Sequence, residues 1–114
     1  MTKGKVVLVP FPFDDLSGEK VRPAVCLTDP IGPNRHVILS FISSQVATEK
    51  PASDLVLDSA HPEFAATGLR VSSLLRLHRL MTVTTSLIRR ELGELSSQMQ
   101  NEIADRLRTL FGLE

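Results

Sequence analysis

The sequence of 114 residues contains no tryptophan, no tyrosine and only one cysteine, Cys26. A single cysteine excludes a disulfide framework, and the apolar neighbours of Cys26 favour a small buried core residue. Five phenylalanines are the only large aromatic residues, so few side chains are available for stacking on nucleotide bases. Charge of one sign is also missing, because 13 basic residues balance 13 acidic ones. Any contact with nucleic acid must therefore come from a local patch.

Motifs for metal, cofactor or covalent chemistry are absent as well. The sequence has no HExxH motif, no paired cysteines and no glycine-rich loop ahead of a helix. The three histidines are scattered along the chain, and we interpret each as structural: His36 opens a predicted strand, His61 lies in a loop and His78 in a turn. The sequence therefore indicates no metal, no cofactor and no protein nucleophile.

Long hydrophobic runs are missing too. No stretch of about 20 apolar residues and no signal-peptide pattern occurs, so we expect no membrane association and a cytoplasmic location. A content of 42% hydrophobic and 23% charged residues is typical of a soluble globular protein. The length predicts a single domain spanning residues 1–114.

What the sequence does contain is a series of short apolar runs separated by turn residues. They predict six strands, at Val6–Phe11, Pro23–Thr28, His36–Ile42, Asp54–Asp58, Leu69–Leu77 and Arg79–Thr85. Polar turn residues lie between the first two runs, and residues 29–34 contain two prolines, a glycine and an asparagine, which predicts a second hairpin. Because strands do not alternate with helices, the sheet is predicted to be antiparallel.

The C-terminal segment has a different period. Apolar residues spaced by four, four, four and three predict one face of a helix: Leu95, Met99, Ile103, Leu107 and Leu110. Ser96 or Ser97 can cap this helix, Ser97 and Gln100 have capping-box spacing, and Gly112 ends it. The opposite face is predicted to be solvated and carries Asn101, Glu102, Asp105, Arg106 and Arg108. The predicted fold is mainly β: a small, strongly curved antiparallel sheet or barrel with a C-terminal helix packed across it.

Two polar residues lie at neighbouring strand ends. Arg22 directly precedes Pro23, which restricts the backbone before it and is tolerated at the first residue of a strand. Ser43 follows the third predicted strand. In consecutive antiparallel strands the start of one lies beside the end of the next, so Arg22 and Ser43 are predicted to share one rim of the sheet. A guanidinium and a hydroxyl together suit a phosphate or a carboxylate.

Several segments together resemble a known family. They are Gly4–Phe13, the run Val21-Arg22-Pro23-Ala24-Val25, Phe41–Gln45, Gly68-Leu69 with Ser72-Ser73, and Ile88–Leu95. In this combination they resemble the MazF/PemK family of toxins from bacterial type II toxin-antitoxin systems. The R-P-A sequence after the opening G-[DK]-[VI]-V-x-V-x-F, followed by a strand that ends in [TS]-[TSA]-Q, is the most specific part of the resemblance.

The resemblance implies an SH3-like (CcdB/MazF-like) barrel that forms a homodimer. It implies cleavage of single-stranded RNA, typically mRNA at short sequence motifs, without a metal or another cofactor. In that family the 2′-hydroxyl attacks the adjacent phosphorus and leaves a 2′,3′-cyclic phosphate and a free 5′-hydroxyl. The implied partner is a cognate antitoxin whose disordered tail folds onto the toxin dimer and covers the RNA groove.

The resemblance also implies roles for individual residues. Arg22 takes the position of the catalytic arginine, which stabilises charge in the transition state. Ser43 stands where the family usually has threonine, so it keeps the hydroxyl but lacks the methyl group that restricts χ1. Glu19 is the expected acidic helper, although a solvated loop carboxylate explains it equally well.

Further residues are expected to contact RNA. Ser44 and Gln45 complete the strand-end motif. Arg70, Arg76 and Arg79 are candidates for a positive groove along the RNA backbone, and a solvated sheet face is the alternative interpretation of these three arginines.

Two other functions stay open at this point. One is a CcdB-like toxin that binds DNA gyrase through the C-terminal end of its helix, here Leu110–Glu114. The other is a catalytically inactive member of the family that acts only as a binding module, which the serine at position 43 would permit.

Overall fold

The computed structural model of the protein describes residues 2–10, 21–45 and 51–113. Within these ranges it contains six strands, two short 3₁₀ turns and one α-helix. In chain order they are β1 (Lys5–Pro10), β2 (Val21–Cys26), β3 (His36–Ser43), β4 (Leu55–Leu57), η1 (Ala65–Thr67), β5 (Ser73–Thr84), η2 (Thr85–Leu87), β6 (Arg90–Glu94) and α1 (Ser97–Leu110).

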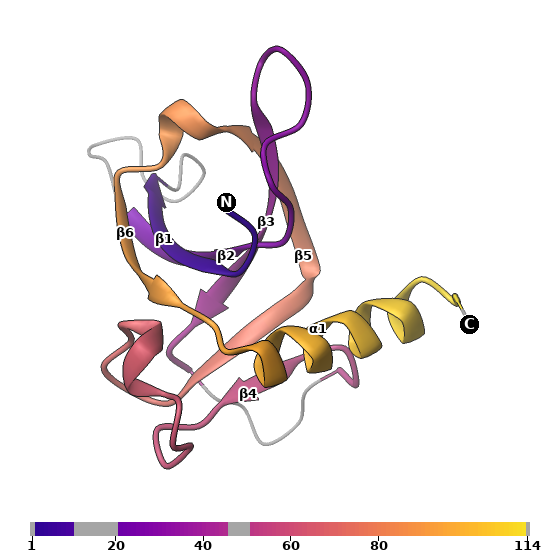
Figure 1. The fold of residues 1–114 in the computed structure, drawn as a ribbon. Coiled ribbons are helices and arrows are strands. Elements are labelled where there is room, and N and C mark those ends of the chain that lie inside the picture. Colours follow the sequence, from indigo (N-terminus) through magenta and orange to yellow (C-terminus); the bar gives the residue numbers. More distant parts are fainter. Residues whose placement is uncertain (1, 11–20, 46–50, 114) are drawn as a thin grey trace.

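The six strands form one sheet in the order β4-β5-β3-β2-β1-β6, and every neighbouring pair is antiparallel. Figure 1 shows the sheet curled into a half-barrel, with α1 lying across it next to β4 and projecting beyond the body at its C-terminal end. The mainly β, curved antiparallel fold with a C-terminal helix is therefore confirmed.

The sheet is packed on both faces. One hydrophobic cluster contains Val25 of β2 and receives Met99 and Ile103 from the apolar stripe of α1. The other cluster lies on the opposite face and contains the neighbours of Val25 in β2, Ala24 and Cys26. Because successive side chains of a strand point to opposite faces, β2 contributes to both clusters in turn.

The prediction of two separate strands at Leu69–Leu77 and Arg79–Thr85 was wrong. A single strand, β5, runs from Ser73 to Thr84, and residues 69–72 lie outside it. The two polar residues His78 and Arg79 resemble a turn in the sequence, but the register of β5 against β3 shifts between Ser40 and Ile42, opposite this point. The extra β5 residues are thus accommodated in an irregularity that bends the strand without ending it.

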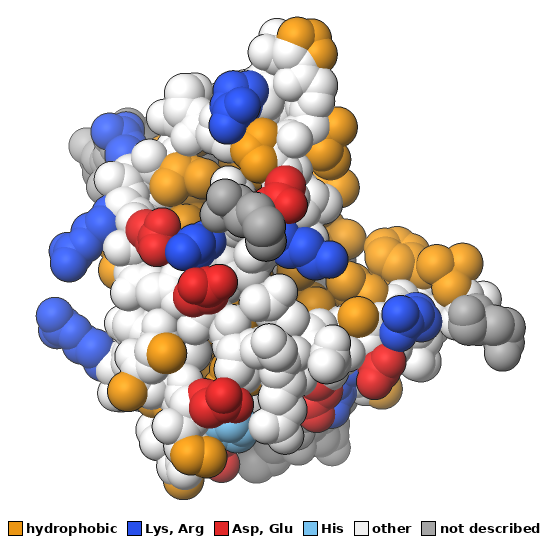
Figure 2. Space-filling model, viewed as in Figure 1, with side chains coloured by type: hydrophobic (Ala, Val, Ile, Leu, Met, Phe, Trp, Pro, Cys, Tyr) orange, Lys and Arg blue, Asp and Glu red, His pale blue; other side chains and the backbone are white. Residues whose placement is uncertain are grey.

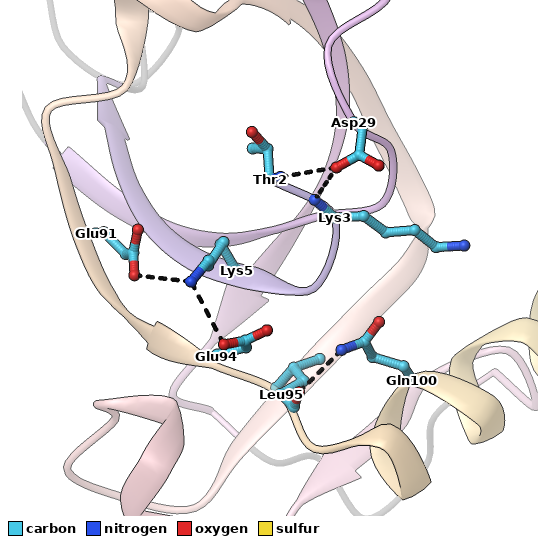
Figure 3. A network of polar contacts seen from close by, with 8 residues as sticks. All are labelled: Thr2, Lys3, Lys5, Asp29, Glu91, Glu94, Leu95 and Gln100. Carbon is cyan, nitrogen blue, oxygen red and sulfur yellow. Dashed lines mark hydrogen bonds and ion pairs between the residues drawn. The ribbon is translucent and has the colours of Figure 1, made fainter.

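The sixth strand, β6, was predicted only as a segment leading into the helix. It pairs with β1, with Lys5 opposite Glu94 and Val6 opposite Gly93. None of its residues is buried, because it forms an edge of the sheet, so it lacks the apolar alternation that identifies a strand. The Nζ of Lys5 lies 3.3 Å from Glu91 Oε2 and 3.4 Å from Glu94 Oε1, which links β1 to this edge (Figure 3).

The helix begins and ends close to its predicted limits. Ser96 is the N-cap, and its Oγ accepts a hydrogen bond of 3.2 Å from the backbone N–H of Met99. The capping box between Ser97 and Gln100 was wrong, since Gln100 Nε2 instead donates to the carbonyl oxygen of Leu95 (Figure 3). Gly112, with φ of +70°, follows the last turn as predicted.

The polar face of α1 is exposed at Asn101, Glu102, Asp105 and Arg108, as predicted. Arg106 differs, because its guanidinium is directed onto the start of β4. Its Nη1 donates to the carbonyl oxygens of Ala52 at 2.8 Å and Asp54 at 2.7 Å. The ion pair expected between Glu102 and Arg106 is present at 4.0 Å.

Candidate functional site

The register of the sheet aligns the two predicted site residues. In the ladder between β2 and β3, Ala24 lies opposite Phe41 and Cys26 opposite Leu39. Continuing this register by two residues toward the start of β2 sets Arg22 opposite Ser43. The two residues therefore share one edge of the sheet, because directly opposite residues on an antiparallel pair lie about 5 Å apart.

Arg22 and Ser43 also share one face. Alternation along β2 puts Arg22 on the side of Ala24 and Cys26, and alternation along β3 puts Ser43 on the side of Leu39 and Phe41. These four core residues belong to the same cluster, which lies on the face that α1 leaves uncovered. Arg22 is exposed and Ser43 is half-buried, so the pair forms the rim of this cluster.

The residues after β3 continue the same rim. Ser44 and Gln45 are exposed, and the backbone N–H of Gln45 donates to Ser43 Oγ at 3.1 Å. Since this oxygen already accepts a hydrogen bond, the Ser43 hydroxyl hydrogen is left to donate to another acceptor. Glu19, the predicted acidic helper, lies outside the described residues.

A second basic residue lies on β5, the strand that pairs with the end of β3. Ser43 pairs with Leu74 of β5, and Arg76 is two residues further along that strand. Leu75 and Leu77 belong to the cluster under α1, so Arg76 between them faces the other side of the sheet, the side of Ser43.

A family model described as "PemK-like, MazF-like toxin of type II toxin-antitoxin system" matches residues 2–111. The chain belongs to this toxin family. No curated protein matches the chain in a sequence search.

Solved structures agree with this assignment at the level of the fold. The Mycobacterium tuberculosis toxin MazF-mt6 is 18% identical, with a TM-score of 0.73 over 96% of this chain and 98% of that one. A MazE-MazF structure from Deinococcus radiodurans is 19% identical, with a TM-score of 0.70 over 100% and 97%. A mycobacterial endoribonuclease in complex with its cognate antitoxin is 16% identical, with a TM-score of 0.67 over 100% and 97%.

In this MazF-like toxin, Arg76 is held by a carboxylate. Its Nε lies 2.9 Å from Oδ2 of Asp54, whose side chain is completely buried, whereas the Arg76 side chain is 28% exposed. The angles do not meet hydrogen-bond criteria despite the short distance, so the contact is an ion pair. A buried carboxylate without a counter-charge is strongly unfavourable, and Arg76 supplies that charge.

A histidine contacts the same carboxylate. His78 Nδ1 lies 3.3 Å from Oδ1 of Asp54, and the His78 side chain is 36% exposed. Figure 1 shows β4, which Asp54 directly precedes, lying next to α1, the helix that sends Arg106 onto the Asp54 carbonyl. Three basic side chains from two elements thus surround one acidic residue.

The other two predicted arginines lie apart from this group. Arg70 is in the segment between Gly68 and β5, outside any strand. Arg79 is exposed on β5 next to Leu80, which pairs with Ser40, three residues along β3 from Ser43. No described contact joins either arginine to Ser43.

Sequence reasoning missed Asp54. An aspartate at the start of a predicted strand resembles an ordinary solvated strand end. One sequence feature pointed toward an acidic partner. Arg76 and His78 alternate with the leucines at 75 and 77, which indicates two basic side chains on one face of a strand.

Cys26 is a core residue, as predicted. It is fully buried, and burial together with the nearby negative charge of Glu91 raises the pKa of its thiol to about 11. It also lines a cleft of about 210 Å³ between β2 and α1, at the opposite end of β2 from Arg22. This cleft contains neither Arg22 nor Ser43.

Among residues 2–10, 21–45 and 51–113, no group of three or more histidine, cysteine or acidic side chains is arranged to hold a metal ion. Within the same ranges the helix α1 is too short and too polar to cross a membrane.

Proposed function

We propose that this MazF-like toxin is a sequence-specific, metal-independent endoribonuclease that cleaves single-stranded RNA, including mRNA, in the cytoplasm. The observation that carries the proposal is the β2–β3 register, which pairs Ala24 with Phe41 and, when continued by two residues, sets Arg22 opposite Ser43, in a chain that belongs to a toxin family. A structural neighbour described as an endoribonuclease supports the same activity.

The proposed reaction uses the substrate's own nucleophile. The ribose 2′-oxygen forms a bond to the adjacent phosphorus and loses its proton, while the bond from phosphorus to the 5′-oxygen breaks and that oxygen gains a proton. The products are a 2′,3′-cyclic phosphate and a 5′-hydroxyl. The protein has to orient the phosphate and stabilise the charge that develops on its oxygens.

Arg22 and Ser43 have different roles in the proposed reaction. The Arg22 guanidinium stays charged at all working pH values and offers donors in a planar fork that matches phosphate oxygens. Ser43 donates its hydroxyl hydrogen to one of those oxygens. Ser44, Gln45 and the arginines at 70, 76 and 79 contact the flanking nucleotides, and Glu19 is the proposed acidic helper.

A direct experiment is to incubate the purified protein with single-stranded RNA in EDTA and to analyse the ends of the products. We expect cleavage that leaves cyclic phosphates. Arg22→Ala should reduce the rate by at least 10²-fold, on the order of the loss when one oriented donor is removed. Arg108→Ala is the matched control, because Arg108 is an exposed arginine on α1 paired with Asp105. Intact RNA at high enzyme concentration would overturn the proposal.

The serine at position 43 has its own test. Ser43→Ala removes the hydroxyl and should lower the rate, whereas Ser43→Thr keeps it and restricts χ1. If Ser43→Ala cleaves as fast as the unchanged protein, Ser43 has no part in the reaction.

We also propose a homodimer and a cognate antitoxin as partners. A neighbour described as a complex with its cognate antitoxin supports the second partner. Hydrophobic side chains gather between the body and the C-terminal half of α1 (Figure 2), and Phe111 and Leu113 beyond the helix are 57% and 63% exposed. A solution mass of twice 12.6 kDa is expected, and a mass of 12.6 kDa would exclude a stable dimer.

The same exposed pair keeps one rival function open, a toxin that binds gyrase through the end of its helix. The two functions are separated by measuring growth arrest for two variants. One is the double helix-end variant Phe111→Ser/Leu113→Ser, and the other is Arg22→Ala. Loss of toxicity with Arg22→Ala alone supports the nuclease. Loss with the helix-end variant, together with full toxicity of Arg22→Ala, supports the rival.

A further inference from the structure

The ion pair between Asp54 and Arg76 has an unusual distribution of exposure. Asp54 has a side chain with no exposed surface, while its partners Arg76 and His78 are 28% and 36% exposed. A buried carboxylate is therefore paired with an arginine that extends toward the surface. Such a carboxylate can fix the direction in which a cation points while it cannot itself touch a large ligand.

Of the two partners of Asp54, Arg76 is the one whose orientation matters for a ligand. Arg76 uses its Nε toward Asp54. No hydrogen bond or ion pair is described for its terminal nitrogens within residues 2–10, 21–45 and 51–113. These nitrogens form the part of the guanidinium that recognises phosphate oxygens.

The position of Arg76 relative to the rim supplies the second observation. Arg76 lies two residues beyond Leu74, the β5 partner of Ser43, and on the same face of the strand as Leu74. The backbone of Arg76 is held as well, since Ser40 Oγ donates to the Arg76 carbonyl oxygen at 2.8 Å. Both ends of this arginine are thus held, on the strand that pairs with Ser43 and on the same face of the sheet as Ser43.

We propose that Asp54 is a positioning residue, whose buried carboxylate fixes the Arg76 guanidinium as a second phosphate subsite beside Ser43. The ligand is the phosphate next to the one held by Arg22 and Ser43 on the same RNA chain, so the inference rests on the proposed function. His78 Nδ1, 3.3 Å from Asp54 Oδ1, is the second contact that keeps the carboxylate in place.

The direction in which RNA affinity changes on substituting Asp54 tests this role. Asp54→Asn keeps the shape of the side chain but removes a negative charge near the RNA path. By charge alone this change strengthens RNA binding. If Asp54 positions Arg76, the same change weakens binding, on the order of tenfold, because a charge-assisted contact is lost. Asp105→Asn is the matched control, since Asp105 also pairs with an arginine but lies exposed on α1.

The probe is a pool of 12-nucleotide single-stranded RNAs of random sequence whose riboses carry 2′-O-methyl groups, so that the attacking hydroxyl is blocked. We expect weaker binding by Asp54→Asn and binding within about twofold of the unchanged protein by Asp105→Asn. With cleavable RNA, Asp54→Asn should raise KM and leave kcat nearly unchanged, as for a lost ground-state contact. Equal or tighter binding by a folded Asp54→Asn variant overturns the proposal.

Two further variants keep the test decisive if Asp54→Asn does not fold. Arg76→Lys keeps the charge opposite Asp54 but lacks the planar fork, so affinity should fall while its salt dependence is unchanged. The double variant D54N/R76Q removes both charges together and should lower the slope of log K against log salt by about 0.7, the value for one phosphate contact on a single strand. Unchanged affinity of Arg76→Lys, or an unchanged slope of the double variant, overturns the subsite.

The outcomes also separate this inference from the proposed function. RNA binding with the expected Asp54 effect but no cleavage overturns the nuclease and leaves the subsite intact. Cleavage that depends on Arg22 but not on Asp54 overturns only the subsite. Absence of any RNA binding overturns both.

Discussion

The two edges of the sheet are stabilised in different ways. At one edge, the start of β4 is joined to β5 through the buried Asp54 carboxylate, which contacts Arg76 and His78. It is joined to α1 through Arg106, which donates to the Asp54 carbonyl oxygen. At the other edge, β6 is joined to β1 by the contacts of Lys5 to the exposed Glu91 and Glu94 (Figure 3). That second edge also packs its backbone tightly against η1 at Gly93.

The two edges differ in whether their ion pairs are exposed to water or buried. Exposed ion pairs are screened by water and salt and stabilise a protein little, so β6 depends mainly on close packing. A buried ion pair is sensitive to the loss of one partner, because the remaining charge stays out of water. The β4 edge therefore depends on a buried ion pair, whose Arg76 is also the proposed phosphate ligand, whereas the β6 edge depends mainly on close packing.

The largest expected effect is that of Arg76→Ala. This variant leaves the Asp54 carboxylate buried with His78 as its remaining ion-pair partner, and the free energy of unfolding should fall by about 3–5 kcal/mol. Urea denaturation measures the loss. Adding Asp54→Asn removes the unpaired charge and should restore part of the stability. A loss below about 1 kcal/mol for Arg76→Ala would show that water reaches the carboxylate and that the two edges do not differ.

The next largest effect tests the packing at the β6 edge. A Cβ atom at Gly93 would meet the backbone carbonyl oxygens of Ala66 and Thr67 and the Thr67 carbonyl carbon. Because these are backbone atoms, they cannot rotate away as a side chain would, and Gly93→Ala should destabilise the fold by about 2–3 kcal/mol. Thermal unfolding followed by circular dichroism gives the shift.

Gly112→Ala is the matched control for Gly93→Ala. Gly112 has open space around it but a φ of +70°, so its replacement introduces backbone strain without a clash. We expect a smaller loss than for Gly93→Ala. The reverse order would show that η1 moves away from β6 at little cost.

A smaller effect is expected for Arg106→Ala. Its guanidinium donates to two carbonyl oxygens at the start of β4, but its side chain is 35% exposed, so water can replace part of the contact. The loss should be about 1 kcal/mol, measured by urea denaturation. Arg108→Ala, which breaks only the exposed pair with Asp105, should cost less. Equal losses for the two variants would mean that α1 does not hold β4 through Arg106.

Much of the fold was predictable from sequence, and so was the strand-end position of two candidate site residues. Strand polarity fixes which ends of neighbouring strands meet, so Arg22 and Ser43 were expected on one rim before any register was known. The helix was predictable because its apolar stripe follows a single period, ending at the glycine after Phe111.

The remaining parts depend on tertiary contacts that leave no local pattern. The edge strand β6 has no buried residue, and its formation depends on a glycine that admits the backbone of η1. The continuity of β5 through His78 and Arg79 depends on a register shift between β5 and β3, and these residues are more than 30 positions from β3 in the chain. Asp54 is buried because Arg76 and His78 face it, and separations of this length cannot be read from periodicity.

The smallest expected effect is the pH response of the Lys5 contacts at the β6 edge. Hydrogen bonds from Lys5 to the carboxylates of Glu91 and Glu94 raise the pKa of its ammonium above its usual value of 10.5. A raised pKa in the folded state gives stability that is fully present below pH 10.5 and is lost as the pH rises through the folded pKa. The melting temperature should therefore fall slightly more between pH 9 and pH 11 for the unchanged protein than for Lys5→Gln, and 1 M salt should reduce this difference. Lys3→Gln serves as the control, because the described contact of Lys3 is made by its backbone N–H to Asp29. An identical pH response of Lys5→Gln and the unchanged protein would mean that the β6 edge depends on packing alone, which would widen the contrast with the ionic β4 edge.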